Sequence, residues 1–366
     1  MFLTARIFGV FTYIVLLCLA LLGVRYLPQR QTKYVIWGYL LVLCAVAYIY
    51  VPDVNKDITR LALYAQDYAQ KSLNDFLDLL TTAKSGLFML VYFRLFANCL
   101  MPVTCMIVFG SAFYILADTC KKLHVIRSIV MLALMWIMTN DFYVISISNI
   151  RSYVAVAFVT FCIYREIFQH KFNVLNIFLY LCAIEMHSMG IVLVAFRILV
   201  YLVSGGKITV WKIILVPIIL ATLILAFPIY QDFLIRSSDK FEGYYTNGTY
   251  NYVWERIIFT IQTIVQGYIL WKAYVYRLFK ENPWNSCRLL VIASFVVLLI
   301  CHVRVTFMQR WIIFSTILEL PVLIRLLQLE HEKHRHQVKQ FLIATCLITF
   351  AFVCSRGNLC SLKFWE

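Results

Sequence analysis

The chain has 366 residues, of which 63% are hydrophobic and only 14% are charged. Soluble domains use about 45–50% apolar and about 25% charged residues, so the composition excludes an ordinary soluble fold and indicates an integral membrane protein with many helical spans. The formal net charge of +15 does not indicate a nucleic-acid partner, because in a membrane protein the distribution of charge between loops carries the information.

Apolar runs recur along the chain and predict a single all-α transmembrane domain over residues 1–366. The run from Ile7 to Val24 has neither a strongly basic segment before it nor a clear cleavage site, so we expect a retained span rather than a signal peptide. We expect about twelve spans, some of them short or broken. They are 7–24, 34–51, 103–118, 126–139, 150–168, 174–186, 188–202, 208–228, 256–275, 286–302, 307–326 and 338–354.

After the second expected span, the segment VPDVNKDITRLALYAQDYAQKSLNDFLDLL (51–80) repeats apolar residues at helical spacing beside several acids. This pattern predicts an amphipathic helix on the outer surface, within an outer segment of about 52–85. Asp53 and Asp57 follow the end of a span and are the better candidates for a base, whereas the other carboxylates are interpreted as a solvated face. The next run, 86–100, either dips into the bilayer and returns or lies along its surface.

The stretch SISNIRSYVAVAF (146–158) puts Arg151 at the start of an apolar helix, after residues that cap helices well. Helix N-terminal amides and an arginine make a good anion site, but arginines also anchor helices at the lipid interface. Further on, EMHSMG (185–190) puts His187 within 174–202, which is either one tilted helix or two short helices broken near the histidine. The imidazole either bonds a neighbouring backbone group or acts in a site.

The stretch HVRVTFMQRW (302–311) predicts a short outer hairpin that aims Arg304 and Arg310 inward. The alternative is an ordinary pair of flanking charges. These cations lie on the side where the distribution of loop charges, described below, predicts fewer of them. We therefore retain both arginines as candidates for anion binding.

A second outer segment, the loop of about 230–255, is rich in tyrosine and tryptophan. Aromatic rings match the apolar faces of sugars, and interfacial aromatic belts use the same residue types. On the first interpretation, Tyr244, Tyr245 and Trp254 are candidates for glycan binding.

The loop charges arrange the chain across a membrane. If 86–100 does not cross and the chain breaks at His187, six loops share one side and hold eighteen of the 33 Lys and Arg but four of the 18 Asp and Glu. The positive-inside rule makes that side cytoplasmic and leaves both termini outside. The six loops are 25–33, 119–127, 164–173, 203–212, 272–288 and 325–339. The candidates Asp53, Asp57, Arg151, His187, Arg304 and Arg310 then gather at the outer boundary.

Motifs for other chemistries are missing from the sequence. It contains no GxxxxGK[ST], HExxH or GxSxG motif and no Cys/His spacing that suits a metal. We therefore do not expect a P-loop ATPase or a zinc protease, and we expect no metal and no other cofactor.

The stretch NIRSYVAVAFVTFCIYREIFQHKFNVLNIFLYLCAIEMHSMGIVLVAF (149–196), with the acidic segment after the second span, resembles the EpsG or Wzy-type polysaccharide polymerase family. The family stretch typically reads as Arg-Gln, an apolar helix, a basic cytoplasmic turn and a helix that ends in His-Ser. Arg151 matches the arginine and His187-Ser188 match the His-Ser pair, while Ser152 replaces the Gln. The resemblance covers about residues 140–200.

The resemblance implies a membrane glycosyltransferase similar to GT-C enzymes, in the bacterial cytoplasmic (inner) membrane with its active site facing the periplasm or exterior. Such polymerases join oligosaccharide repeats carried on undecaprenyl diphosphate during synthesis of O-antigen, capsule or exopolysaccharide. The implied partners are these lipid-linked oligosaccharides, the lipid bilayer, and chain-length regulator and flippase proteins.

The same resemblance suggests roles for the candidates. On this hypothesis Arg151, Arg304 and Arg310 bind the diphosphate, since arginine grips phosphate groups in a bidentate manner. His187 serves as the base or orients a substrate, and Asp53 or Asp57 contributes to catalysis or acceptor binding.

Two other functions stay open. A flippase or other transporter of lipid-linked oligosaccharides requires charges along a path through the bilayer, and the charges inside the expected spans are few. The other is a different enzyme on the same face, such as an O-antigen ligase or an acyltransferase; a ligase would share the arginines and the lipid donor. The interior charges are Arg94, Asp118, Glu185, Arg197 and Glu319.

Overall fold

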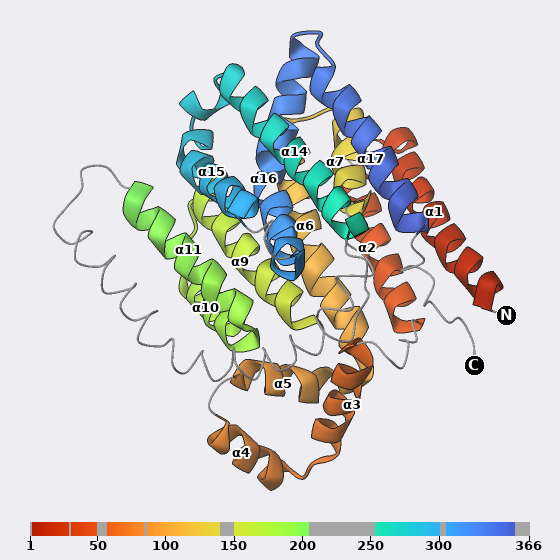
Figure 1. The fold of residues 1–366 in the computed structure, drawn as a ribbon, viewed down its shortest axis with the longest axis vertical. Coiled ribbons are helices and arrows are strands. Elements are labelled where there is room, and N and C mark those ends of the chain that lie inside the picture. Colours follow the sequence, from red (N-terminus) through yellow and green to blue (C-terminus); the bar gives the residue numbers. More distant parts are fainter. Residues whose placement is uncertain are drawn as a thin grey trace.

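The structure is a computed structural model, and its described residues form helices and turns with no strand among them (Figure 1). It describes residues 2–28, 31–49, 57–83, 86–139, 150–204, 253–300 and 305–355. The elements are α1 (Phe2–Tyr26), α2 (Thr32–Ile49), α3 (Asp57–Gln70), α4 (Leu73–Thr82), α5 (Leu87–Phe96), η2 (Ala97–Cys99), α6 (Leu100–Leu123), α7 (Arg127–Thr139), α9 (Ile150–Phe168), α10 (Val174–Met186), α11 (Ser188–Ser204), α14 (Val253–Val275), η3 (Leu278–Lys280), α15 (Trp284–Ile300), α16 (Val305–Glu332) and α17 (Gln337–Ser355).

The all-α class is confirmed for the described residues. Eleven of the twelve expected spans coincide with helices, and the bounds of α9 and α10 match the expected 150–168 and 174–186. The remaining expected span, 208–228, lies outside the described residues. Two helical stretches in the described part of the chain, Leu87–Leu123 and Met308–Glu332, are long and apolar enough to cross a membrane.

Helix α16 is the central element of the bundle (Figure 1). It packs against α6, α7, α9, α14 and α15. Its apolar side chains are buried all round, as Trp311, Phe314, Leu320 and Leu323 illustrate with at most 1% exposure. A helix that is apolar on every face needs neighbours on every face, and this explains why the other helices surround α16.

Five of the six basic loops meet at one end of the bundle. Hydrogen bonds join the end of α1 to α7 (Arg127 Nη1 to Arg25 O, 2.9 Å) and the end of α6 to α9 (Lys122 Nζ to Phe168 O, 3.0 Å). A third, from Gln328 Nε2 to Leu123 O at 3.1 Å, joins α16 to α6. The described parts of 25–33, 119–127, 164–173, 272–288 and 325–339 thus lie at one end, as a common side requires, while 203–212 lies outside the described residues except for its first two positions. We call this the basic end.

Four basic residues follow helices at the basic end with left-handed backbone. They are His124, His170, Arg277 and His334, with φ between 49° and 58°. Glycine usually takes this position because it avoids the Cβ penalty. Here a cationic or ionisable side chain stands at the negative end of each helix dipole, where positive charge is favourable. The same four loops therefore end helices and concentrate basic side chains.

The opposite end is covered by α3, α4 and α5 (Figure 1). The single amphipathic helix expected over 51–80 is wrong: the chain forms α3 and α4, because the Ser72 side chain caps α4 by accepting the Asp75 N–H at 3.2 Å. The run 86–100 forms α5, which lies across the end of the bundle before α6 begins. Arg94 of α5 holds the α3–α4 junction by donating to the Lys71 carbonyl at 3.1 Å.

Helices α10 and α11 form a tight hairpin, so the alternative of one long tilted helix is excluded. Only His187 separates them, and Gly190 lies so near that a Cβ there would be 1.9 Å from the Ala183 carbonyl oxygen. Near the basic end, Glu166 of α9 binds to both helices of this hairpin. Its carboxylate accepts from Tyr180 of α10 at 2.7 Å and from Arg197 of α11 at 2.9 and 3.0 Å.

We expect Glu166→Gln to lower the free energy of unfolding by about 3 kcal/mol, because it removes one partner of a largely buried ion pair. The side chains of Arg197 and Glu166 are 15% and 11% exposed. Thermal unfolding of the purified chain in detergent measures the effect. The control is Glu281→Gln, whose carboxylate is 55% exposed beside Arg325 and should matter little. Equal losses of stability in the two variants would show that Glu166 does not hold α10 and α11 together.

Candidate functional site

The candidate site lies at the α10–α11 turn, at the end of the bundle that α3, α4 and α5 cover (Figure 1). Four elements supply it: the first turn of α9, the turn itself, the first two turns of α16 and the start of α5. The first turn of α9, the α10–α11 turn and the first turns of α16 lie together because α9, α11 and α16 all begin at this end. Helix N-termini carry partial positive charge, so the arrangement favours an anion.

His187 is held by the helix that follows it. Its Nδ1 accepts the Met189 backbone N–H at 3.0 Å, and its carbonyl accepts the Gly190 N–H at 2.7 Å. The interpretation of a histidine that bonds a neighbouring backbone is therefore confirmed. Because Nδ1 is an acceptor, the proton of a neutral ring is on Nε2. The imidazole thus offers a hydrogen-bond donor from Nε2 rather than a base.

Two arginines act on His187. His187 lies between α10 and α11 and belongs to neither helix. Burial, together with the positive charges of Arg310 and Arg151, lowers the pKa of its imidazole to about 3. The imidazole is therefore neutral at pH 7. The charges of two guanidinium groups, from α9 and α16, thus act on an imidazole at the α10–α11 turn, an arrangement that suits a polyanion such as a diphosphate.

Arg151 is half-buried and covered by α5. Its Nη1 lies 3.7 Å from the Met89 sulfur, and its charge also reaches Tyr68 of α3, where it opposes the rise in pKa that burial causes. A guanidinium that packs against Met89 of α5 differs from an anchor that extends to the lipid interface. Ser146, Ser148 and Asn149, which would cap α9, lie outside the described residues.

Glu185 attaches α5 to this site. Its Oε2 accepts the backbone N–H groups of Gly86 at 2.9 Å and Leu87 at 3.0 Å. These groups open α5, where amides are unpaired and the helix dipole favours a carboxylate. Gly86 has φ +79°, a conformation in which glycine avoids strain. The residue two positions before His187 therefore fixes the helix that covers Arg151.

We expect Glu185→Gln to loosen α5, because a neutral amide replaces two charge-assisted hydrogen bonds worth about 1.5–3 kcal/mol each at full strength. Amide hydrogen exchange should accelerate about tenfold over 86–96, which corresponds to roughly 1.4 kcal/mol. The matched control is Glu332→Gln at the basic end, where Glu332 faces Arg325 at 3.7 Å. Unchanged exchange in α5 would show that Glu185 does not hold this helix.

The remaining candidates fall outside what the structure describes. Asp53, Tyr244, Tyr245 and Arg304 lie outside the described residues. Asp57 and Trp254 belong to α3 and α14, but their side chains are outside the described part. The proposed base and glycan-binding residues thus stay predictions. Within the described ranges, no group of three His, Cys, Asp or Glu residues is placed to hold a metal ion.

Three contributors to the site were not predicted as such. They are Glu185, Met89 and Tyr68. The EMHSMG stretch places Glu185 beside His187, but its partners are 98 and 99 residues away. Met89 and Tyr68 reach Arg151 only because α3 and α5 fold over the bundle end, and apolar periodicity does not encode that contact.

Comparison of the chain with models of protein families, with curated proteins and with solved structures found no match.

Proposed function

We propose that this chain is a polytopic membrane glycosyltransferase of the EpsG/Wzy polymerase type, with about twelve spans in a GT-C-like arrangement. Two stretches with the length of a span support the membrane assignment, together with seven shorter apolar helices. Exposed apolar side chains on outer helices, such as Leu41 (61%) and Trp271 (56%), suit contact with lipid.

The proposed orientation follows from the basic end. With that end on the cytoplasmic side of a bacterial inner membrane, His187, Arg151 and α5 face the periplasm or exterior. Lipid-linked oligosaccharides present their sugars there after transport across the membrane. The proposed active site is thus on the side where its donor and acceptor meet.

The observation that carries the proposal is that the charges of Arg151 of α9 and Arg310 of α16 both act on the buried His187 at the α10–α11 turn. In the proposed reaction an acceptor hydroxyl attacks the anomeric carbon of the donor glycan while the bond to undecaprenyl diphosphate breaks. Negative charge grows on the diphosphate oxygen as it leaves. Two guanidinium groups stabilise that charge without changing protonation state, and a partly enclosed site strengthens the effect.

His187 serves as an orienting donor in this proposal. Its Nε2–H points a hydrogen bond at a phosphate or sugar oxygen, while Met189 fixes the tautomer from the other nitrogen. The acceptor hydroxyl must lose a proton as the new bond forms. We assign that proton to Asp53 or Asp57, at the start of the outer segment that continues into α3.

Four of the five interior charges do not favour a transporter; the fifth, Glu319, is 2% exposed, and its Oε2 has no hydrogen-bond partner among the described residues. Arg94 holds the α3–α4 junction, Asp118 accepts from Tyr164 and Lys122 at 2.7 Å each, and Arg197 pairs with Glu166. Each has a local structural partner. Glu185 caps α5 in the same manner. A pathway for charged headgroups requires polar groups that are available along its length.

Deletion of the gene from a strain that makes the glycan tests the proposal. A polymerase mutant should carry single repeats on the final acceptor and no long chains. Loss of a ligase leaves long chains on undecaprenyl diphosphate instead, and loss of a flippase leaves single repeats on the cytoplasmic side. Either of the last two patterns contradicts the polymerase assignment.

A further inference from the structure

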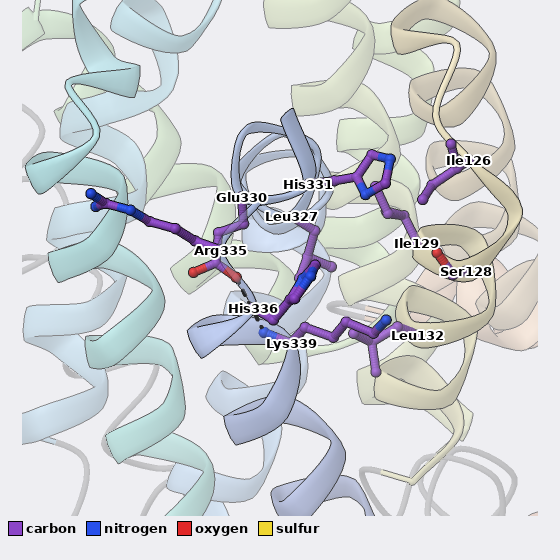
Figure 2. Close-up of a pocket in the computed structure, with 10 residues that line it drawn as sticks. All are labelled: Ile126, Ser128, Ile129, Leu132, Leu327, Glu330, His331, Arg335, His336 and Lys339. Atoms are coloured by element: carbon purple, nitrogen blue, oxygen red, sulfur yellow. Dashed lines mark hydrogen bonds between the residues drawn. The ribbon is translucent and has the colours of Figure 1, made fainter. Parts of the chain in front are cut away.

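A small pocket lies at the basic end, between the first turn of α7, the end of α16 and the start of α17 (Figure 2). Its volume is about 20 Å³, enough for one water-sized group. A phosphate oxygen fits this space, whereas a larger group must lie over the mouth. The residues that matter for recognition are Ser128, His331, His336 and Lys339, with apolar Ile126 and Leu132 beside them.

The ionisable side chains of the pocket are available for an anion. Figure 2 shows His331 and Lys339 reaching from α16 and α17 toward α7, whereas Arg335 extends to the opposite side. In the described part of the chain, none of His331, His336 and Lys339 takes part in an ion pair. The Lys339 ammonium is therefore not neutralised by an acid side chain in contact with it, and both imidazoles are available as hydrogen-bond donors.

The acid that lines this pocket has a different task. Glu330 is 1% exposed, and its carboxylate accepts the Val338 N–H at 3.0 and 3.1 Å and the Lys339 N–H at 3.4 Å. It thus caps α17, as the dashed line to Lys339 in Figure 2 indicates. This cap fixes the first turn of α17 and with it the position of the Lys339 side chain.

The helices that form the pocket also expose apolar side chains. Ile126 at its edge is 38% exposed, and α17 also exposes Phe341 (37%), Leu347 (58%) and Ile348 (54%). A soluble phosphate ion makes no favourable contacts with apolar side chains. An anionic phospholipid combines a phosphodiester with acyl chains, so it suits a basic pocket between helices that expose apolar side chains.

We propose that this pocket binds the phosphodiester headgroup of an anionic phospholipid of the surrounding bilayer. Lys339 and the two imidazoles contact the phosphate, the Ser128 hydroxyl donates to it, and the acyl chains lie along the neighbouring helices, beginning beside Ile126. Basic pockets between helices on the cytoplasmic side are a general means of holding anionic lipids. The inference rests on the membrane assignment in the proposed function, but it does not depend on glycan transfer.

Native mass spectrometry of the purified full-length chain in detergent tests the inference, with phosphatidylglycerol or phosphatidylcholine added. We expect phosphatidylglycerol to bind at least about fivefold more tightly, since one lysine near an anionic headgroup alone contributes a factor of this order. The double variant His336→Gln/Lys339→Gln should remove the preference. The matched control is Lys171→Gln/Lys280→Gln, which also changes exposed positions at the basic end and should keep it.

Three results would overturn the inference. One is an equal loss in the pocket and control variants, which would indicate diffuse charge rather than a site. Another is the lack of any preference in the unmodified chain. The third is displacement of phosphatidylglycerol by millimolar inorganic phosphate, which would identify a soluble anion as the ligand. Helix content measured by circular dichroism verifies that the variants are folded. Because the binding measurement needs no glycan substrate, its outcome does not depend on whether the polymerase assignment is correct.

Discussion

Replacement of Arg151 by lysine should reduce glycan polymerisation about 100-fold while leaving the protein folded. Loss of one preorganised donor to a developing oxyanion costs about 10²–10³ in rate in well-studied enzymes. Lysine keeps the positive charge but lacks the planar pair of donors that matches a phosphate. Arg151→Ala should be at least as severe. Product length per amount of membrane protein, or turnover of the purified chain, measures the effect.

The matched control for this prediction is Arg256→Lys. Arg256 is exposed in the first turn of α14, so the same substitution there should change polymerisation by less than about twofold. Near-normal activity of Arg151→Lys would make the side chain a structural cation held by Met89 and its neighbours. The diphosphate site would then have to be rebuilt around Arg310.

Replacement of Gly190 by alanine should open the α10–α11 hairpin and lose most of the folded protein. The new Cβ would lie 1.9 Å from the Ala183 carbonyl oxygen and 3.0 Å from the Ile184 nitrogen. Both are backbone atoms that no side-chain rotation moves, so the cost should exceed the roughly 3 kcal/mol of ordinary overpacking. His187, three residues before Gly190, would move away from Arg151 and Arg310.

Gly38→Ala provides the control for the hairpin, because a Cβ on Gly38 of α2 meets nothing within 4 Å. Alanine should stabilise that helix by up to about 1 kcal/mol. Size-exclusion profiles and unfolding temperatures of the two variants in one detergent give the comparison. Equal yields and equal unfolding temperatures would show that α10 and α11 do not approach as described.

The helices themselves were predictable. The bounds of α9 and α10 agree with those expected because charged or polar residues, such as Arg165 and Asn173, end the apolar runs near the basic end. The division between α3 and α4 was not predictable from apolar spacing, because it depends on a single serine. Ser72 bonds the backbone of Asp75 and starts a new helix, whereas apolar spacing runs through the whole segment without interruption.

The site was predictable in part. Arg151, His187 and Arg310 were expected at one boundary from loop charge alone, and the structure brings them within electrostatic reach of one another. The tautomer of His187 was beyond prediction, because it depends on the Met189 amide turning back in the first turn of α11. The link from Glu185 to α5 was also beyond prediction, since it spans nearly a hundred residues of sequence.

Reconstitution of the purified chain with undecaprenyl-diphosphate-linked repeats in vesicles tests whether this chain itself polymerises the glycan. No nucleotide sugar and no other protein should be present. We expect lipid-linked dimers and longer chains, with one undecaprenyl diphosphate released for each glycosidic bond formed. Persistence of single repeats, with no release of undecaprenyl diphosphate from a folded and membrane-inserted chain, would contradict it.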